Sequence, residues 1–162
     1  MNKKECFVKV QLKNKKETTH NLRFLEAGEN NGFYDIRCYD ESENEMGFVT
    51  FKLNKNEGKI WLYKIETHDD FLHRGVATAL INTMEYVAMK NSINCIEGKY
   101  YPENDFAKPF YEKYGYYLPN QTKSWDNYDD TWTMSKYLDF KKIRENIEPN
   151  ISFEKQGAGL EM

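Results

Sequence analysis

The run H-R-G-V-A-T at residues 73–78 stands where small residues lead into a segment with helical apolar periodicity. The first turn of a helix has unpaired N–H groups and the positive end of the helix dipole, so it attracts anions. Gly75 and Ala77 would let a phosphate approach the main chain closely, while Arg74 could add charge and Thr78 a hydroxyl. Neither G-x-x-x-x-G-K-[ST] nor G-x-G-x-x-G is present. A tight strand-to-helix turn without a ligand would also give this run, so a phosphate site needs a second motif in support.

A second group of polar and aromatic residues, N-D-F-A-K-P-F-Y-E-K-Y-G-Y, covers residues 104–116. Asn104 offers a side-chain amide, and Tyr111 offers a phenolic hydroxyl that could act as a proton donor. The alternative for Tyr111 is an aromatic helix residue packed on a sheet. Gly115 is typical of the position after a helix, and Pro109 predicts a late start or a distortion of that helix.

Hydrophobic periodicity predicts the elements that position these two segments. The predicted strands are 5–12, 33–40, 46–53, 59–67, 93–99, 116–118 and 132–138, and the predicted helices are 76–90 and 106–114. Strand 59–67, the next helix and strand 93–99 form a βαβ unit, so these strands should be parallel neighbours. Leu22, Leu25 and Ala27 permit a short helix within residues 13–31.

The order of these elements and motifs resembles the GNAT superfamily of N-acetyltransferases, which use acetyl-CoA. The resemblance rests on the R-G-x-A turn and on N-x-x-A-x-x-F-Y-x-K-x-G-aromatic, and it spans residues 59–116, about a third of the chain. It implies an α/β (α+β) fold with a GNAT-like mixed, mostly antiparallel central sheet, a parallel βαβ unit at the cofactor site, and flanking helices. The chain departs from the family at Leu72, where Gln or Arg is favoured; main-chain contacts survive that change.

The resemblance also implies roles for individual residues. Main-chain groups of Ile65 and Thr67 are expected to contact the pantetheine arm and the thioester. The expected pyrophosphate cradle consists of His73, Arg74, Gly75, Val76, Ala77 and Thr78. Asn104 is expected to contact the cofactor through its amide, and Tyr111 to lie near the sulfur. Acetyl-CoA is thus the expected co-substrate, and no metal is expected.

Acetyl transfer to a primary amine requires removal of a proton. An amine with a pKa near ~10.4 is neutral in only about one molecule in 2,500 at pH 7, so a base would help. Glu97, on the strand beside the expected groove, is the first candidate for this base, and Glu66 is the second. A water chain, or no dedicated base, is the alternative. Tyr111 could donate to the departing thiolate.

The segment Ser124–Trp132 mixes carboxylates and aromatic rings. By family analogy it lies beside the acceptor, where it would suit a cationic amine of a small molecule or a peptide. The alternative is a solvated turn anchored by its tryptophans. The expected function is therefore N-acetyl transfer by direct attack of the amine on the thioester; the alternative is a non-catalytic GNAT-fold module that binds CoA or a protein.

Composition limits the class of protein. The chain has 162 residues, a net charge of −3, 40% hydrophobic residues and 15% aromatic residues, enough to bury a core. The charge balance argues against nucleic-acid binding, and the lack of a long apolar run argues against a membrane span. Cysteines at positions 6, 38 and 95 have no metal or disulfide spacing, which favours a cytoplasmic protein with reduced thiols.

The same features predict the organisation of the chain. One GNAT-like acetyltransferase domain is expected over residues 1–146, followed by a flexible tail over residues 147–162 that is poor in apolar residues. The strands that flank the C-terminal loop could also pair in a homodimer.

Overall fold

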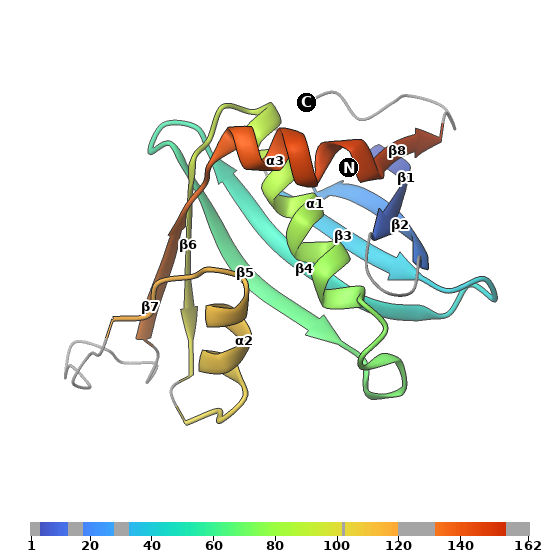
Figure 1. The fold of residues 1–162 in the computed structure, drawn as a ribbon, viewed down its shortest axis with the longest axis horizontal. Coiled ribbons are helices and arrows are strands. Elements are labelled where there is room, and N and C mark those ends of the chain that lie inside the picture. Colours follow the sequence, from blue (N-terminus) through green and yellow to red (C-terminus); the bar gives the residue numbers. More distant parts are fainter. Residues whose placement is uncertain (1–3, 13–17, 28–32, 102, 120–131, 155–162) are drawn as a thin grey trace.

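The computed structural model describes residues 4–12, 18–27, 33–101, 103–119 and 132–154, whose strands form one sheet (Figure 1). The strands are β1 Lys4–Leu12, β2 Thr18–Ala27, β3 Phe33–Tyr39, β4 Glu45–Asn54, β5 Lys59–Thr67, β6 Cys95–Tyr100, β7 Trp132–Tyr137 and β8 Ile151–Glu154. The α-helices are α1 Val76–Lys90, α2 Ala107–Lys113 and α3 Phe140–Asn146, with short 3-10 helices at Asp69–Phe71 and Glu148–Asn150. No helix in these ranges is both long and apolar enough to cross a bilayer.

The sheet has the strand order β7-β6-β5-β4-β3-β2-β1-β8. All neighbouring strands are antiparallel except β5 and β6, which are parallel and joined through α1. Figure 1 shows α1 and α3 across one face of the sheet and α2 between the diverging ends of β5 and β6. A mixed, mostly antiparallel sheet with one parallel βαβ unit and flanking helices confirms the fold class predicted from the sequence.

The core lies between the sheet and α1. Every second residue of β3 and of most of β4 is buried, which matches their alternating sequence pattern. The apolar stripe of α1 packs against this face. The largest side chains that are fully buried here are Ile36, Phe51, Ile60, Leu80, Ile81 and Met84. Burial of each side chain stabilises the fold by about 1.5–3 kcal/mol, so α1 is packed stably against the sheet.

The structure corrects the expectation of a short helix within residues 13–31. Residues Thr18–Ala27 form strand β2, which pairs with β1 on one side and with β3 on the other. Main-chain pairing along both edges outweighs the brief helical spacing of Leu22, Leu25 and Ala27, because short apolar runs do not distinguish helix from strand. Residues 13–17 and 28–31 lie outside the described residues.

The C-terminal region also differs from the expectation. The prediction of a flexible tail from residue 147 is wrong for residues 147–154, because Ile151–Glu154 forms β8 and pairs with β1. Ile151 and Phe153 alternate with Ser152 and Glu154, and the edge of β1 supplies main-chain partners for this segment. Residues 155–162 lie outside the described residues. The strand expected at 116–118 is reduced to one bridge, between Tyr117 and Ser135.

An ion pair joins α1 to β7 across the end of α2. Glu85 on α1 is 4% exposed, and the Lys136 Nζ atom on β7 donates to both of its carboxylate oxygens at 3.0 Å. The same Nζ donates to the main-chain oxygen of Tyr114 at 2.7 Å. Burial raises the pKa of Glu85, and the charge and hydrogen bonds of Lys136 offset that increase only in part.

We expect Lys136→Met to lower the free energy of unfolding by about 3–5 kcal/mol at neutral pH, because it leaves Glu85 buried without a partner. The variant raises the pKa of Glu85 further. A carboxyl group whose pKa is higher in the folded state than in the unfolded state destabilises the folded protein as pH rises. The loss of stability in Lys136→Met should therefore grow between about pH 4 and pH 8. Urea unfolding at both pH values measures this.

The double variant Glu85→Gln with Lys136→Met is the matched control. It removes both charges, so it should be more stable than Lys136→Met at pH 8. A deficit for Lys136→Met that stays the same at both pH values would contradict this account of the pair.

Candidate functional site

A cavity of about 620 Å³ lies between the end of β5, the first turn of α1 and α2. Its lining residues are Ile65, Glu66, Thr67, Asp69, Leu72, His73, Gly75, Val76, Ala77, Thr78, Asn104, Phe106, Ala107, Phe110, Tyr111, Lys113 and Tyr114. All the predicted cofactor residues line this cavity except Arg74, whose guanidinium lies over the Phe71 ring at 5.4 Å from its centre. The two sequence motifs therefore meet at one site.

The cavity exists because β5 and β6 separate. Their parallel pairing covers only Ile60–Leu62 against Ile96–Gly98, although β5 continues to Thr67 and β6 to Tyr100. Beyond Leu62, the edge of β5 that faces away from β4 has no strand partner among the described residues. Main-chain N–H and C=O groups on such an edge can bind an extended ligand that carries amides.

The turn before α1 presents main-chain donors to the cavity. His73 and Gly75 both adopt the left-handed conformation, with φ of 63° and 80°. The first helical hydrogen bond runs from the Ala79 N–H to the Gly75 carbonyl, and no side chain caps this end. The N–H groups of residues 76–78 thus have no acceptor within the helix and lie at the end of α1 that lines the cavity. The helix dipole adds positive potential there. The arrangement suits a phosphate.

Two side chains of the predicted site already have partners within the protein. The Thr78 hydroxyl lies 2.7 Å from the Tyr114 hydroxyl, which ties α1 to the end of α2. The Asn104 Oδ1 atom accepts from the Phe106 N–H at 3.0 Å, so its amide NH₂ is the group left to donate to a ligand.

Tyr111 contributes a hydroxyl that stays protonated. Its ring packs among those of Tyr100, Phe110 and Tyr116 while the residue lines the cavity. Burial raises the pKa of Tyr111 to about 12. No residue in the described part of the chain accepts a hydrogen bond from this hydroxyl, so it is available as a donor.

The two candidate bases occupy different places. Glu97 lies in the paired part of β6, opposite Trp61, and its Oε1 atom is 2.8 Å from Lys59 Nζ. It does not line the cavity, whereas Glu66 does. The sequence analysis placed Glu97 on the strand beside the expected groove, but the sequence did not show where β5 and β6 stop pairing.

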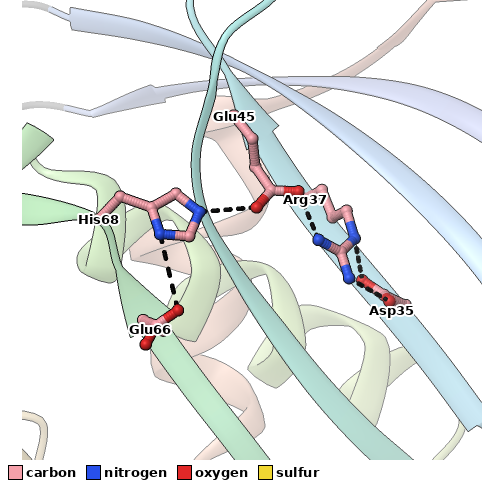
Figure 2. A network of polar contacts seen from close by, with 5 residues as sticks. All are labelled: Asp35, Arg37, Glu45, Glu66 and His68. Atoms are coloured by element: carbon pink, nitrogen blue, oxygen red, sulfur yellow. Dashed lines mark hydrogen bonds and ion pairs between the residues drawn. The ribbon is translucent and has the colours of Figure 1, made fainter.

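A polar network beside Glu66 was missed by the sequence analysis (Figure 2). His68 Nε2 lies 2.6 Å from Glu45 Oε2, and His68 Nδ1 lies 3.6 Å from Glu66 Oε2. Arg37 pairs with Glu45 and, through Nε and Nη2, with both oxygens of Asp35 at 3.0 and 3.1 Å. Burial would raise the pKa of Glu45, but hydrogen bonds from Arg37 and His68 outweigh it, so that pKa is lowered. The sequence signal for this network is the spacing of Asp35 and Arg37, which places both side chains on one face of a strand.

Comparisons with known proteins agree with this arrangement. The family model described as "Acetyltransferase (GNAT) family" matches residues 4–116. The PaiA N-acetyltransferase from Thermoplasma acidophilum, solved in complex with coenzyme A, aligns with a TM-score of 0.57 at 16% identity, over 66% of this chain and 62% of that chain. The aligned part is thus less than two thirds of that relative. No curated protein sequence matches the chain.

Two further structures show the same fold. Nourseothricin acetyltransferase aligns with a TM-score of 0.59 at 15% identity, over 84% of this chain and 86% of that chain. Arabidopsis thaliana Naa50, in complex with the bisubstrate analogue CoA-Ac-MVNAL, aligns with a TM-score of 0.55 at 17% identity, over 64% and 72% of the two chains.

One wall of the cavity depends on the absence of a side chain at Gly47. A Cβ atom there would lie 2.5 Å from the main-chain oxygen of Glu66 and 3.0 Å from Val76 Cγ1. We expect Gly47→Ala to displace this wall and lower the free energy of unfolding by about 1–3 kcal/mol, as overpacking does. Urea unfolding measures the loss. Thr50→Ala, on the same strand, is the control, and equal stability of the two variants would contradict the tight approach.

Proposed function

Because the chain belongs to the GNAT acetyltransferase family, we propose that it is an N-acetyltransferase that uses acetyl-CoA and a primary amine. The observation that carries the proposal is the shared cavity. There the free N–H groups of α1, the open edge of β5 and the hydroxyl of Tyr111 lie together.

The chemistry of the lining residues fits acetyl-CoA. Its pyrophosphate is an anion, which suits the uncapped N-terminus of α1. Its pantetheine arm carries amides, which suit the main-chain edge of Ile65–Thr67 that faces away from β4. A volume of about 620 Å³ is within the ordinary range for small-molecule sites. When bound, acetyl-CoA would supply an acetyl group activated as a thioester.

Glu66 is the base that we propose, in place of Glu97. Glu66 lines the cavity, and Glu97 is paired with Lys59 outside it. Glu66 takes a proton from the bound ammonium, and the freed lone pair of the amine forms the C–N bond by direct attack. The C–S bond breaks and the sulfur leaves as a thiolate. The Tyr111 hydroxyl, still protonated because its pKa is about 12, stabilises that thiolate by a hydrogen bond.

The acceptor that we propose is a positively charged amine of a small molecule or a peptide. Glu66 and Asp69 place carboxylates in the lining of the cavity, and they favour a cation. The structures named for nourseothricin and for a peptide-bearing analogue support both classes of acceptor. The carboxylate-rich segment expected to help, residues 124–131, lies outside the described residues.

Acetyl-CoA at about 100 Kd should stabilise the folded protein by about 2.7 kcal/mol, because it binds only the folded state. For a chain of this size, Tm rises by about 2–4 °C per kcal/mol, so a shift of several degrees is expected in a thermal-unfolding titration. Absence of a saturable shift would contradict the proposed function. A shift without release of thiol in the presence of amines would favour the non-catalytic CoA-binding module.

Tyr111→Phe should lower kcat by about tenfold to a hundredfold and leave acetyl-CoA affinity almost unchanged. The lost hydrogen bond is to a charged group, worth about 1.5–3 kcal/mol, and it forms only as the thiolate develops. Thiol release gives kcat, and the thermal titration gives affinity. Tyr117→Phe, at a residue that is 68% exposed and outside the cavity, is the control. An unchanged kcat in Tyr111→Phe would exclude this role.

A further inference from the structure

His68 lies between two carboxylates that come from neighbouring strands (Figure 2). Glu45 begins β4, Glu66 is near the end of β5, and the imidazole contacts both, through Nε2 and Nδ1 respectively. The main chain of His68 is fixed as well. Its N–H donates to the Met46 carbonyl at 2.9 Å, and its carbonyl accepts from the Phe71 N–H at 2.9 Å. The ring is therefore held at the side of the cavity.

The contact with Glu45 determines which nitrogen carries the proton. An ionised carboxylate only accepts hydrogen bonds, so at 2.6 Å the His68 Nε2 atom must be the donor. In the neutral ring the lone pair is then on Nδ1, the atom that faces Glu66 at 3.6 Å. Glu45 thus turns the basic nitrogen of His68 toward the one carboxylate of the network that lines the cavity.

The groups behind Glu45 keep it ionised and in place. Arg37 on β3 binds Glu45 and is held in turn by Asp35. Lys64 on β5 also lies in this region, because its Nζ is 5.7 Å from the centre of the Phe48 ring that packs beside His68. The 3-10 helix adds Asp69 next in sequence. Glu45 and Glu66 make the direct side-chain contacts with the imidazole.

We infer that His68 is a positioning residue for acetyl transfer that acts through Glu66: its Nδ1 atom receives the proton that Glu66 removes from the acceptor amine. This inference rests on the proposed function and adds to it the route by which the proton leaves the site.

The transfer balances without any further reactant. The ammonium N–H bond breaks and its proton moves to a Glu66 oxygen, which leaves the amine lone pair free for attack on the thioester carbon. The proton then moves from Glu66 to His68 Nδ1, and the imidazolium is bound between Glu45 and Glu66. The His68 side chain is 35% exposed, so the proton can pass on to water and restore the neutral ring.

Kinetics with acetyl-CoA and three probe amines, spermidine, kanamycin and a peptide with a free N-terminus, test the inference. His68→Gln keeps a donor for Glu45 but cannot take a proton. We expect kcat at pH 7 to fall by about tenfold to a hundredfold, with little change in acetyl-CoA affinity. The deficit should shrink toward pH 10, where about a quarter of an amine with a pKa near ~10.4 is already deprotonated, against about one molecule in 2,500 at pH 7. A merely structural role would lower kcat by the same factor at every pH.

Two further variants sharpen the result. Glu45→Gln should lower kcat with the same pH dependence, because it no longer fixes the proton on Nε2. Asp40→Asn, in the exposed turn before β4, removes a carboxylate that accepts hydrogen bonds from Ser42 and Asn44, and kcat should not change. If His68→Gln and Glu45→Gln keep the kcat and pH profile of the unaltered protein, the inference is overturned and the proposed function stands.

Nitrogen NMR of the unaltered protein gives a readout that does not need turnover. Neutral His68 should carry its proton on Nε2, and Glu45→Gln should weaken that preference. A proton found on Nδ1 would overturn the inference. Absence of both an acetyl-CoA thermal shift and thiol release in the unaltered protein would instead overturn the proposed function, and the inference with it.

Discussion

The point at which β5 and β6 stop pairing is the constraint on which the site depends. Parallel strands joined through a helix can remain paired along their length, but here the ladder ends at Leu62 and Gly98. Gly98 marks this point, because a Cβ there would lie 2.7 Å from Met134 Cε and 3.1 Å from the Leu62 oxygen. Beyond it the strands diverge, α2 fills the space between them, and the edge of β5 stays open to a ligand. The same divergence brings the start of α1 close to Asn104 and Tyr111.

Two groups of charged residues lie on the two sides of this opening, and they differ in how far they are exposed to solvent. Glu85 is almost fully buried, and its pair with Lys136 holds α1, α2 and β7 in fixed relation. Asp35, Arg37, Glu45, His68 and Glu66 form a half-exposed chain of contacts on the other strands. The half-exposed chain ends at the cavity and also reaches solvent, which is what transfer of a proton requires.

The strands before β3 extend the sheet on its far side. β2 and β1 continue the antiparallel order, and β8 from the C-terminal part of the chain closes the edge of β1. Strands β3 and β4, which carry Arg37 and Glu45, are consequently interior strands of the sheet. Interior strands have ladder partners on both edges, and this holds the network more rigidly than a loop would.

The sequence by itself determined the βαβ unit, the glycine turn before α1 and the place of Tyr111 on the second helix. These features follow from local periodicity and from residue types at short spacing, and the structure brings the two motifs to one cavity. Tertiary structure alone decided that residues 18–27 are a strand, that Ile151–Glu154 pairs with β1, that Glu66 rather than Glu97 lines the cavity, and that His68 contacts Glu45. Such features depend on which main-chain edges meet and where a ladder ends. Those are contacts between residues distant along the chain, and neither periodicity nor residue type encodes them locally.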